Sequence, residues 1–86
     1  MESKSAVIAL GALAHETRLQ IFRLLVRAGA AGLSVGRIAE ALEIEANGRL
    51  TFHLKELVAA GLAGSRQEGR FVFYSTNYGA MNELLR

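Results

Sequence analysis

At 86 residues the chain has room for one domain, because single domains mostly contain about 100–150 residues. Half of the residues (51%) are apolar, a generous share for this size, which suggests that some apolar surface packs against a second copy of the chain. The absence of cysteine excludes disulfides and thiolate metal sites. The net charge of +2 is too small to identify a nucleic-acid partner by itself.

The sequence also bears on localisation and on domain organisation. Its N-terminus lacks the basic and apolar pattern of a signal peptide. The longest apolar stretch, residues 6–14, is shorter than the roughly 20 residues that cross a bilayer. We therefore expect a cytoplasmic protein without a membrane partner. No repeat, proline or linker divides the chain, so we expect a single domain over residues 1–86.

The first two expected helices have different polarity. Residues 6–14 are apolar on every face, and such a helix must be buried on all sides, which in a small domain implies a partner chain. Residues 15–28 carry a polar stripe at helical spacing and end at glycine. The apolar face expected to be buried in this second helix consists of Leu19, Phe22, Leu25 and Val26.

Two further helices are expected over residues 34–61. Ser34 can cap a short helix whose apolar positions follow at helical spacing, and a loop at residues 45–48 comes next. A longer helix, residues 49–60, ends at Gly61. Its expected buried positions are Leu50, Leu54, Leu57 and Val58. Two helices of this size joined by a short turn are the signature of a helix-turn-helix.

The remaining residues predict a hairpin and a last helix. Residues 62–66 and 71–75 read as two strands, with a polar turn containing Gly69 between them, so residues 62–75 form a wing. Asn77 can cap a last helix over residues 78–86. The expected dimer interface joins the first and last helices through Val7, Leu10, Met81, Leu84 and Leu85. The fold class is mainly α with a small β-hairpin, a winged helix-turn-helix of about five helices and a two-stranded wing.

The helix over residues 49–60 carries most of the functional information. At 100° per residue its leucines point one way, and Phe52 points almost directly away from them. One interpretation is a recognition helix in the major groove, with Phe52 on a thymine methyl and Arg49 on a guanine edge. The alternative is a solvated helix whose phenylalanine packs on a loop or on the wing. The candidate DNA-contacting residues here are Asn47, Arg49, Thr51, Phe52, His53 and Lys55.

The wing supplies two more candidates, and the chain lacks a catalytic or metal pattern. Arg66 and Arg70 flank the hairpin tip, where they can contact phosphate or enter the minor groove, although an ordinary charged hairpin has the same composition. The two histidines, His15 and His53, lie in different helices, and a metal site needs several converging donors. We expect no metal, no cofactor and no enzymatic activity.

Three segments resemble the arsenical-resistance-repressor (ArsR) family. They are ALAHETRLQIFRLL, LSVGRIAEAL and LTFHLKELVAAGLAGSRQEGRFVFYS, which together cover most of the chain. The resemblance implies a homodimer that binds an inverted-repeat operator in double-stranded DNA, and repression that an inducer relieves. In this chain the turn before the recognition helix is one residue longer, which leaves Asn47, Gly48 and Arg49 as alternatives for reaching the bases.

The chain departs from the metal-sensing members of that family. Ser34, Val35 and Gly36 stand where those members have Cys-Val-Cys, and the last expected helix lacks the zinc ligands of other members. We therefore expect any response to an inducer, whose identity the sequence does not reveal, to need residues beyond Arg86 or a non-metal signal.

The sequence thus favours an operator-binding transcriptional repressor. One rival is a helix-turn-helix that binds protein instead of DNA, which the exposed Phe52 and the balanced charge of residues 37–70 both favour. A second rival is single-stranded nucleic acid binding, for which Phe52 is the one outward stacking aromatic available.

Overall fold

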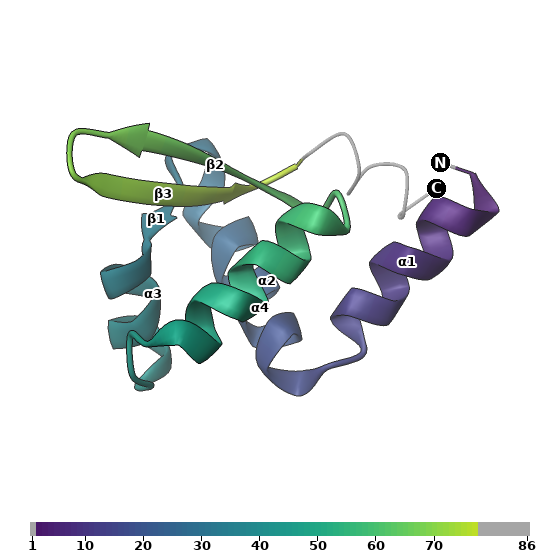
Figure 1. Cartoon of the computed structure of the whole chain (residues 1–86), viewed down its shortest axis with the longest axis horizontal. Coiled ribbons are helices and arrows are strands. Elements are labelled where there is room, and N and C mark those ends of the chain that lie inside the picture. The colour runs from purple at the N-terminus through teal and green to yellow at the C-terminus, as the bar shows by residue number, and fades with distance from the viewer. Residues whose placement is uncertain (1, 78–86) are drawn as a thin grey trace.

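The computed structural model describes residues 2–77, which fold into four α-helices and a three-stranded sheet (Figure 1). The elements in chain order are α1 (Ser3–Leu13), α2 (Glu16–Ala28), the 3₁₀ turn η1 (Gly29–Ala31), β1 (Leu33–Ser34), α3 (Val35–Leu42), α4 (Gly48–Ala59), β2 (Ala63–Glu68) and β3 (Phe71–Thr76). Helices α2, α3 and α4 gather beside the sheet, and α1 extends to one side. The fold is a winged helix, as the sequence predicted.

Side chains at the helix starts explain where the helices begin. His15 precedes α2, and its Nδ1 accepts a hydrogen bond from the Thr17 N–H at 3.2 Å. Ser34 precedes α3, and its Oγ accepts from the Arg37 N–H at 3.3 Å. Each cap satisfies an N–H that has no partner inside its own helix. The predicted cap at Ser34 is therefore confirmed, and His15 lies just outside the helix that was expected to include it.

The core lies between α2, α3, α4 and the base of the sheet. Its completely buried large side chains are Ile21, Leu25, Ile38, Leu50, Leu54, Leu57 and Leu62. The predicted buried face of α2 is correct at Leu25 but omits Ile21. The face that contacts the core is rotated around the helix axis, so Leu19 and Val26 are only partly buried. Val58, predicted to be buried in α4, is exposed.

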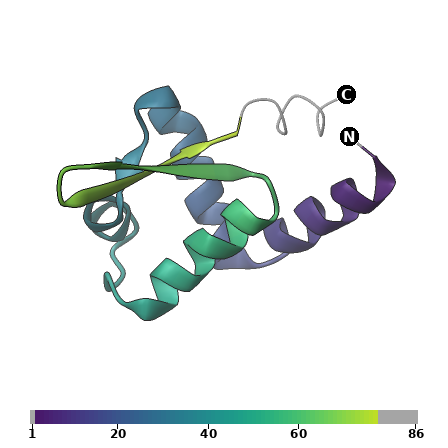
Figure 2. The ribbon, with the colours of Figure 1, turned by 45° about the horizontal axis from the view of Figure 1, so that its top comes forward.

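The expected two-stranded wing is present as strands β2 and β3, and a third strand, β1, which was not expected, extends the sheet. Its order is β1-β3-β2, and both pairings are antiparallel. Strand β1 is only two residues long, and it pairs Leu33 with Tyr74 and Ser34 with Phe73. Strands β2 and β3 form a hairpin that projects beyond the helices (Figure 2). The short β1 therefore ties the wing to the residues that precede α3.

Gly32, at the corner between η1 and β1, approaches β3 closely. It has φ +70, a backbone conformation that side chains disfavour. A Cβ at this position would overlap the carbonyl group of Tyr74. Only glycine fits this close approach of the two backbone segments.

Helix α1 packs through small residues and leaves larger ones in solvent. Ala9 and Ala12 are buried, whereas Val7 is 69% exposed and Leu10 is 58% exposed. The chain thus presents an apolar α1 surface, as expected for a helix that contacts a second copy. The predicted last helix, with Met81, Leu84 and Leu85, falls outside the described residues. No helix within residues 2–77 is long and apolar enough to cross a membrane.

Candidate nucleic-acid interface

Asn47 sets the start of α4. Its Oδ1 accepts hydrogen bonds from the N–H groups of Arg49 (3.1 Å) and Leu50 (3.3 Å), and its Nδ2 donates to the Glu45 carboxylate at 3.2 Å. Asparagine is among the best helix N-caps because its short side chain reaches these orphan donors. The amide of Asn47 is therefore already engaged in shaping the turn between α3 and α4, and its contact with DNA stays a prediction.

The outward face of α4 carries an aromatic and a cationic side chain. Phe52 is 53% exposed, and Lys55 is exposed one helical turn further along. Thr51, half-buried at the edge of this face, donates from Oγ1 to the Asn47 carbonyl at 3.4 Å. The predicted outward position of Phe52 is right, and the guanidinium carbon of Arg18 lies 5.7 Å from the centroid of its ring.

His53 was expected on the outward face, and the structure corrects this. Only 7% of it is exposed, because it follows Leu50 by three residues and precedes Leu57 by four, and both of these leucines are completely buried. Its Nδ1 accepts a hydrogen bond from Nε of Arg18 at 3.1 Å, and its ring centroid lies 4.6 Å from that of His15. His53 therefore joins α4 to the start of α2 and does not lie on the exposed face of the helix.

The surroundings of His53 lower its pKa below the ordinary 6.5. Burial is the largest cause, since a charged imidazolium loses its water, and the positive charges of His15, Arg18 and Arg49 act in the same direction. The Glu56 carboxylate opposes them. The folded protein therefore binds a proton on His53 less readily than the unfolded chain does.

A pH titration of stability should reveal this difference. The folded state benefits fully from neutral His53 above about pH 6.5, and this contribution is lost as the pH falls toward the lower folded pKa. We expect the free energy of unfolding, measured with urea between about pH 7.5 and pH 5.5, to fall more steeply for the unaltered protein than for His53→Gln. Glutamine keeps an acceptor for Arg18 but does not titrate. Equal slopes for the two proteins would contradict the assignment.

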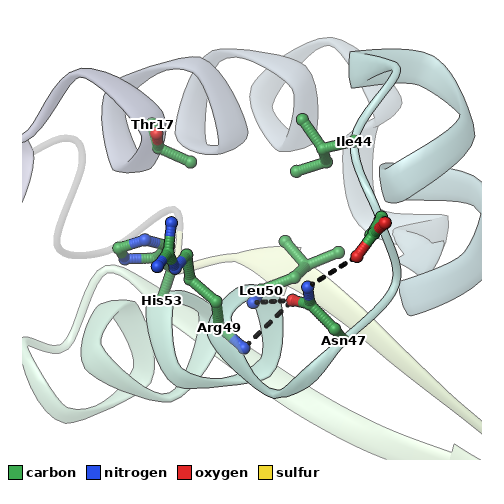
Figure 3. A pocket seen from close by; sticks show the side chains of 7 residues that line it. Thr17, Ile44, Asn47, Arg49, Leu50 and His53 are labelled. Carbon is green, nitrogen blue, oxygen red and sulfur yellow. Dashed lines mark hydrogen bonds between the residues drawn. The ribbon is translucent and has the colours of Figure 1, made fainter.

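A cavity of about 320 Å³ lies between the starts of α2 and α4. Thr17 contributes from α2, whereas Arg49 and His53 contribute from α4 (Figure 3). In Figure 3 the Arg49 side chain runs along the cavity toward the His53 ring. Arg49 is exposed, as predicted, and it lines the cavity together with Thr17 of α2.

Arg18 is the residue of this region that the sequence analysis did not identify. Its guanidinium carbon lies 5.7 Å from the centroid of the Phe52 ring, while its Nε donates to His53. One arginine of α2 thus contacts an outward and an inward residue of α4. No local pattern reveals this, because 35 positions separate Arg18 from His53.

The two arginines of the wing differ in their contacts. Arg70 lies at the exposed two-residue turn with Gly69, and its side chain has no hydrogen bond or ion pair within residues 2–77. Arg66 instead donates to the Ala31 carbonyl at 2.7 Å, pairs with Glu68 at 3.2 Å and lies over the Phe73 ring. Among residues 2–77, Arg66 is thus engaged by other groups of the protein and Arg70 is not.

No metal site is evident in the described part of the chain. Residues 2–77 contain no group of three or more His, Cys, Asp or Glu side chains that could hold an ion. His15 and His53 do come together, but their Nδ1 atoms both accept hydrogen bonds, from the Thr17 N–H and from Arg18.

Comparison with known proteins agrees with this geometry. A family model described as a helix-turn-helix domain matches residues 13–63. The transcriptional activator HlyU of Vibrio cholerae is 42% identical over 86 residues, which cover 96% of this chain and 76% of that protein. A solved structure of HlyU from Vibrio cholerae N16961 superimposes with a TM-score of 0.78 at 39% identity, covering 99% of this chain and 94% of that one.

Two further solved structures carry the family assignment. An ArsR-like transcriptional regulator from Rhodococcus sp. RHA1 has a TM-score of 0.81 at 29% identity, covering 96% of this chain and 74% of its own. The homodimeric winged helix-turn-helix DNA-binding domain of Mb0332 from Mycobacterium bovis, a possible ArsR-family regulator, has a TM-score of 0.77 at 27% identity, covering 95% and 73%. These relatives are regulators and not enzymes. The chain belongs to the ArsR family of winged helix-turn-helix transcriptional regulators.

Proposed function

We propose that this regulator works as a homodimer that binds an inverted-repeat operator in double-stranded DNA. The observation that carries the proposal is the exposed Phe52 on the outward face of α4, with Lys55 beside it. A two-fold axis would place two copies of α4 in successive major grooves, about 34 Å apart on one face of the duplex. The operator would then repeat one half-site in inverted orientation.

The apolar surface of α1 supports the homodimer. Val7, Ile8 and Leu10 are all more than half exposed in the single chain, and a soluble monomer rarely leaves such a cluster in water. The Mb0332 domain from Mycobacterium bovis, which this chain resembles, is described as homodimeric. We assign Val7 and Leu10 to the interface, together with the predicted Met81, Leu84 and Leu85 of the undescribed segment.

Helix and wing would have different roles on the DNA. The outward side chains of α4, Thr51, Phe52 and Lys55, would face base edges, with the phenyl ring against a thymine methyl. Arg70 at the wing tip would contact phosphate or sugar, which adds affinity without reading sequence. Arg66 would add a phosphate contact only after leaving the Ala31 carbonyl.

The proposed outcome of binding is repression, by analogy with the family's repressors. HlyU from Vibrio cholerae, by contrast, is named a transcriptional activator. Binding an operator is common to both outcomes, and the position of the operator relative to the promoter sets the sign. A reporter gene behind the chain's own operator tests the proposal, because repression predicts higher expression when the regulator is deleted. We further propose that this takes place in the cytoplasm.

Binding to duplexes at two salt concentrations tests the function itself. Operator binding should exceed random-duplex binding, and both should weaken as salt rises. A helix-turn-helix that binds protein and not DNA would bind neither duplex, which would overturn the proposal.

Replacing Arg70 with alanine tests the role of the wing. We expect weaker binding to operator and random duplex by a similar factor, with the slope of log K against log salt reduced by about one. Arg23→Ala removes the same charge from an exposed position of α2 and should leave both affinities nearly unchanged. A loss confined to operator preference would instead place Arg70 on a base.

A further inference from the structure

Positive charge gathers where the start of α2 meets the start of α4. Arg18 from α2 and Arg49 from α4 both lie close enough to His53 to disfavour a proton on its ring. The His15 ring packs on the same histidine, and the Glu56 carboxylate is the one negative group that acts on it in the opposite direction. We call Arg18, Arg49 and His53 the basic junction.

Arg18 is held in one position by two contacts with α4. Its Nε donates to His53 at 3.1 Å, and its guanidinium lies over the Phe52 ring at 5.7 Å. Its two terminal nitrogens have no hydrogen-bond acceptor within residues 2–77. Because the side chain is already fixed, little further entropy is lost when these donors bind an anion. The fork of a guanidinium matches a phosphate group.

Arg49 and Thr17 extend the junction across the neighbouring cavity. The guanidinium of Arg49 has no ion pair among the described residues, and its side chain runs toward His53 (Figure 3). The side chain of Thr17 lines the cavity from the α2 side. Glu45, a carboxylate on the cavity wall, accepts a hydrogen bond from Asn47. The junction thus offers two guanidinium groups and a hydroxyl as donors to an anion.

The position of the junction relative to the wing indicates which anion. In Figure 1 the wing lies above α4 and the beginning of α2 lies below it, so the junction and the wing flank the recognition helix. A helix in the major groove has one sugar–phosphate strand on each side. On a duplex with α4 in its major groove, the wing would approach one strand and the junction the other.

We propose that the basic junction binds a backbone phosphate of the DNA strand opposite the one that the wing contacts. Arg18 and Arg49 are the charged donors, and the hydroxyl of Thr17 is a third donor. Arg49 then contacts the backbone and not a guanine edge. The proposal rests on the proposed function, since it names how the same DNA is held.

Arg49→Gln is the first test variant, because an exposed side chain can be replaced without disturbing the core. We expect operator and random duplex to bind roughly five- to tenfold more weakly at about 0.1 M salt, with the salt slope reduced by about 0.9. Arg18→Lys keeps the charge but loses the planar fork and should also weaken both affinities. Arg23→Gln, the matched control on α2, should change neither.

Neutral methylphosphonates placed one at a time in the operator locate the phosphate. At one position on the strand away from the wing, the modification should weaken the unaltered protein by a larger factor than it weakens Arg49→Gln or Arg18→Lys. The same modification should weaken Arg70→Ala by the same factor as it weakens the unaltered protein, because Arg70 contacts the other strand in this proposal. This loss of additivity cannot arise from a general destabilisation of the fold, and circular dichroism of each variant checks the fold directly.

The outcomes separate this proposal from the function on which it rests. If the unaltered protein binds no duplex, both fail. If it binds, but no methylphosphonate position couples to Arg49 or Arg18, the junction does not hold DNA and only this proposal is overturned. A titration of the DNA-free protein with inorganic phosphate, followed by NMR, tests whether the junction binds free phosphate instead of a DNA backbone phosphate. Saturation of the junction by free phosphate without any coupling to the duplex also overturns the assignment to the backbone.

Discussion

A protein in which aspartate replaces Leu10 is expected to sediment as a monomer and to bind an inverted-repeat duplex about 10²–10⁴ times more weakly. Leu10 is 58% exposed in the single chain, so the charge does not enter the monomer core. In the dimer the same position would be buried opposite its symmetry mate, where unpaired carboxylates are costly. The second half-site then no longer binds at the high effective concentration that the dimer provides.

Analytical ultracentrifugation and binding to full and half operators measure this effect. Gln20→Asp, an equivalent charge on an exposed position of α2, is the control and should leave the dimer intact. Affinity for a single half-site should be similar for the unaltered protein and for Leu10→Asp. If the unaltered protein sediments as a monomer at micromolar concentration and still binds the full operator tightly, the dimer is not the binding species.

Gly32→Ala is expected to destabilise the fold by about 3 kcal/mol or more. Two costs combine, because alanine disfavours the positive φ of this residue and its methyl group would overlap the Tyr74 carbonyl. The backbone of β3 must then move, and β1 separates from the sheet. Urea unfolding followed by circular dichroism gives the loss directly.

Gly36→Ala provides the contrasting variant, since Gly36 lies inside α3 and no atom lies within 4 Å of the position that its Cβ would take. Alanine there should raise stability by up to about 1 kcal/mol, because it reduces the freedom of the unfolded chain and favours helix. If both glycines behave alike, the close approach at Gly32 does not govern stability.

The fold was largely predictable from local patterns. Helical spacing of apolar residues found α2, α3 and α4, and the turn at Gly69 located the wing. Strand β1 was missed because two residues are too few to show any periodicity, and its pairing with β3 spans about half of the chain. Ile21 was missed because it lies at the margin of the apolar stripe, while the packing of α1 and β3 on α2 decides which side is buried.

At the candidate site, the exposure of single side chains was predictable, whereas contacts between residues far apart in the sequence were not. Phe52 and Arg70 are exposed as their local sequence indicates. His53 was predicted on the outward face, although its position lies only about 40° around the helix from that of the buried Leu57. The contacts of Arg66 with Ala31 and of Arg18 with His53 each join residues 35 positions apart, and local patterns carry no information on such pairs.

Ser34 has two structural roles whose combination affects how the protein selects DNA. It caps α3 through its hydroxyl and pairs with Phe73 in the sheet through its backbone. The base of the wing is therefore joined to the start of α3, and we expect the separation between wing tip and recognition helix to vary little. A duplex whose groove width does not match this separation must deform, at an energy that depends on its base steps. We expect the chain to discriminate among operators by the stiffness of base pairs that none of its side chains touches.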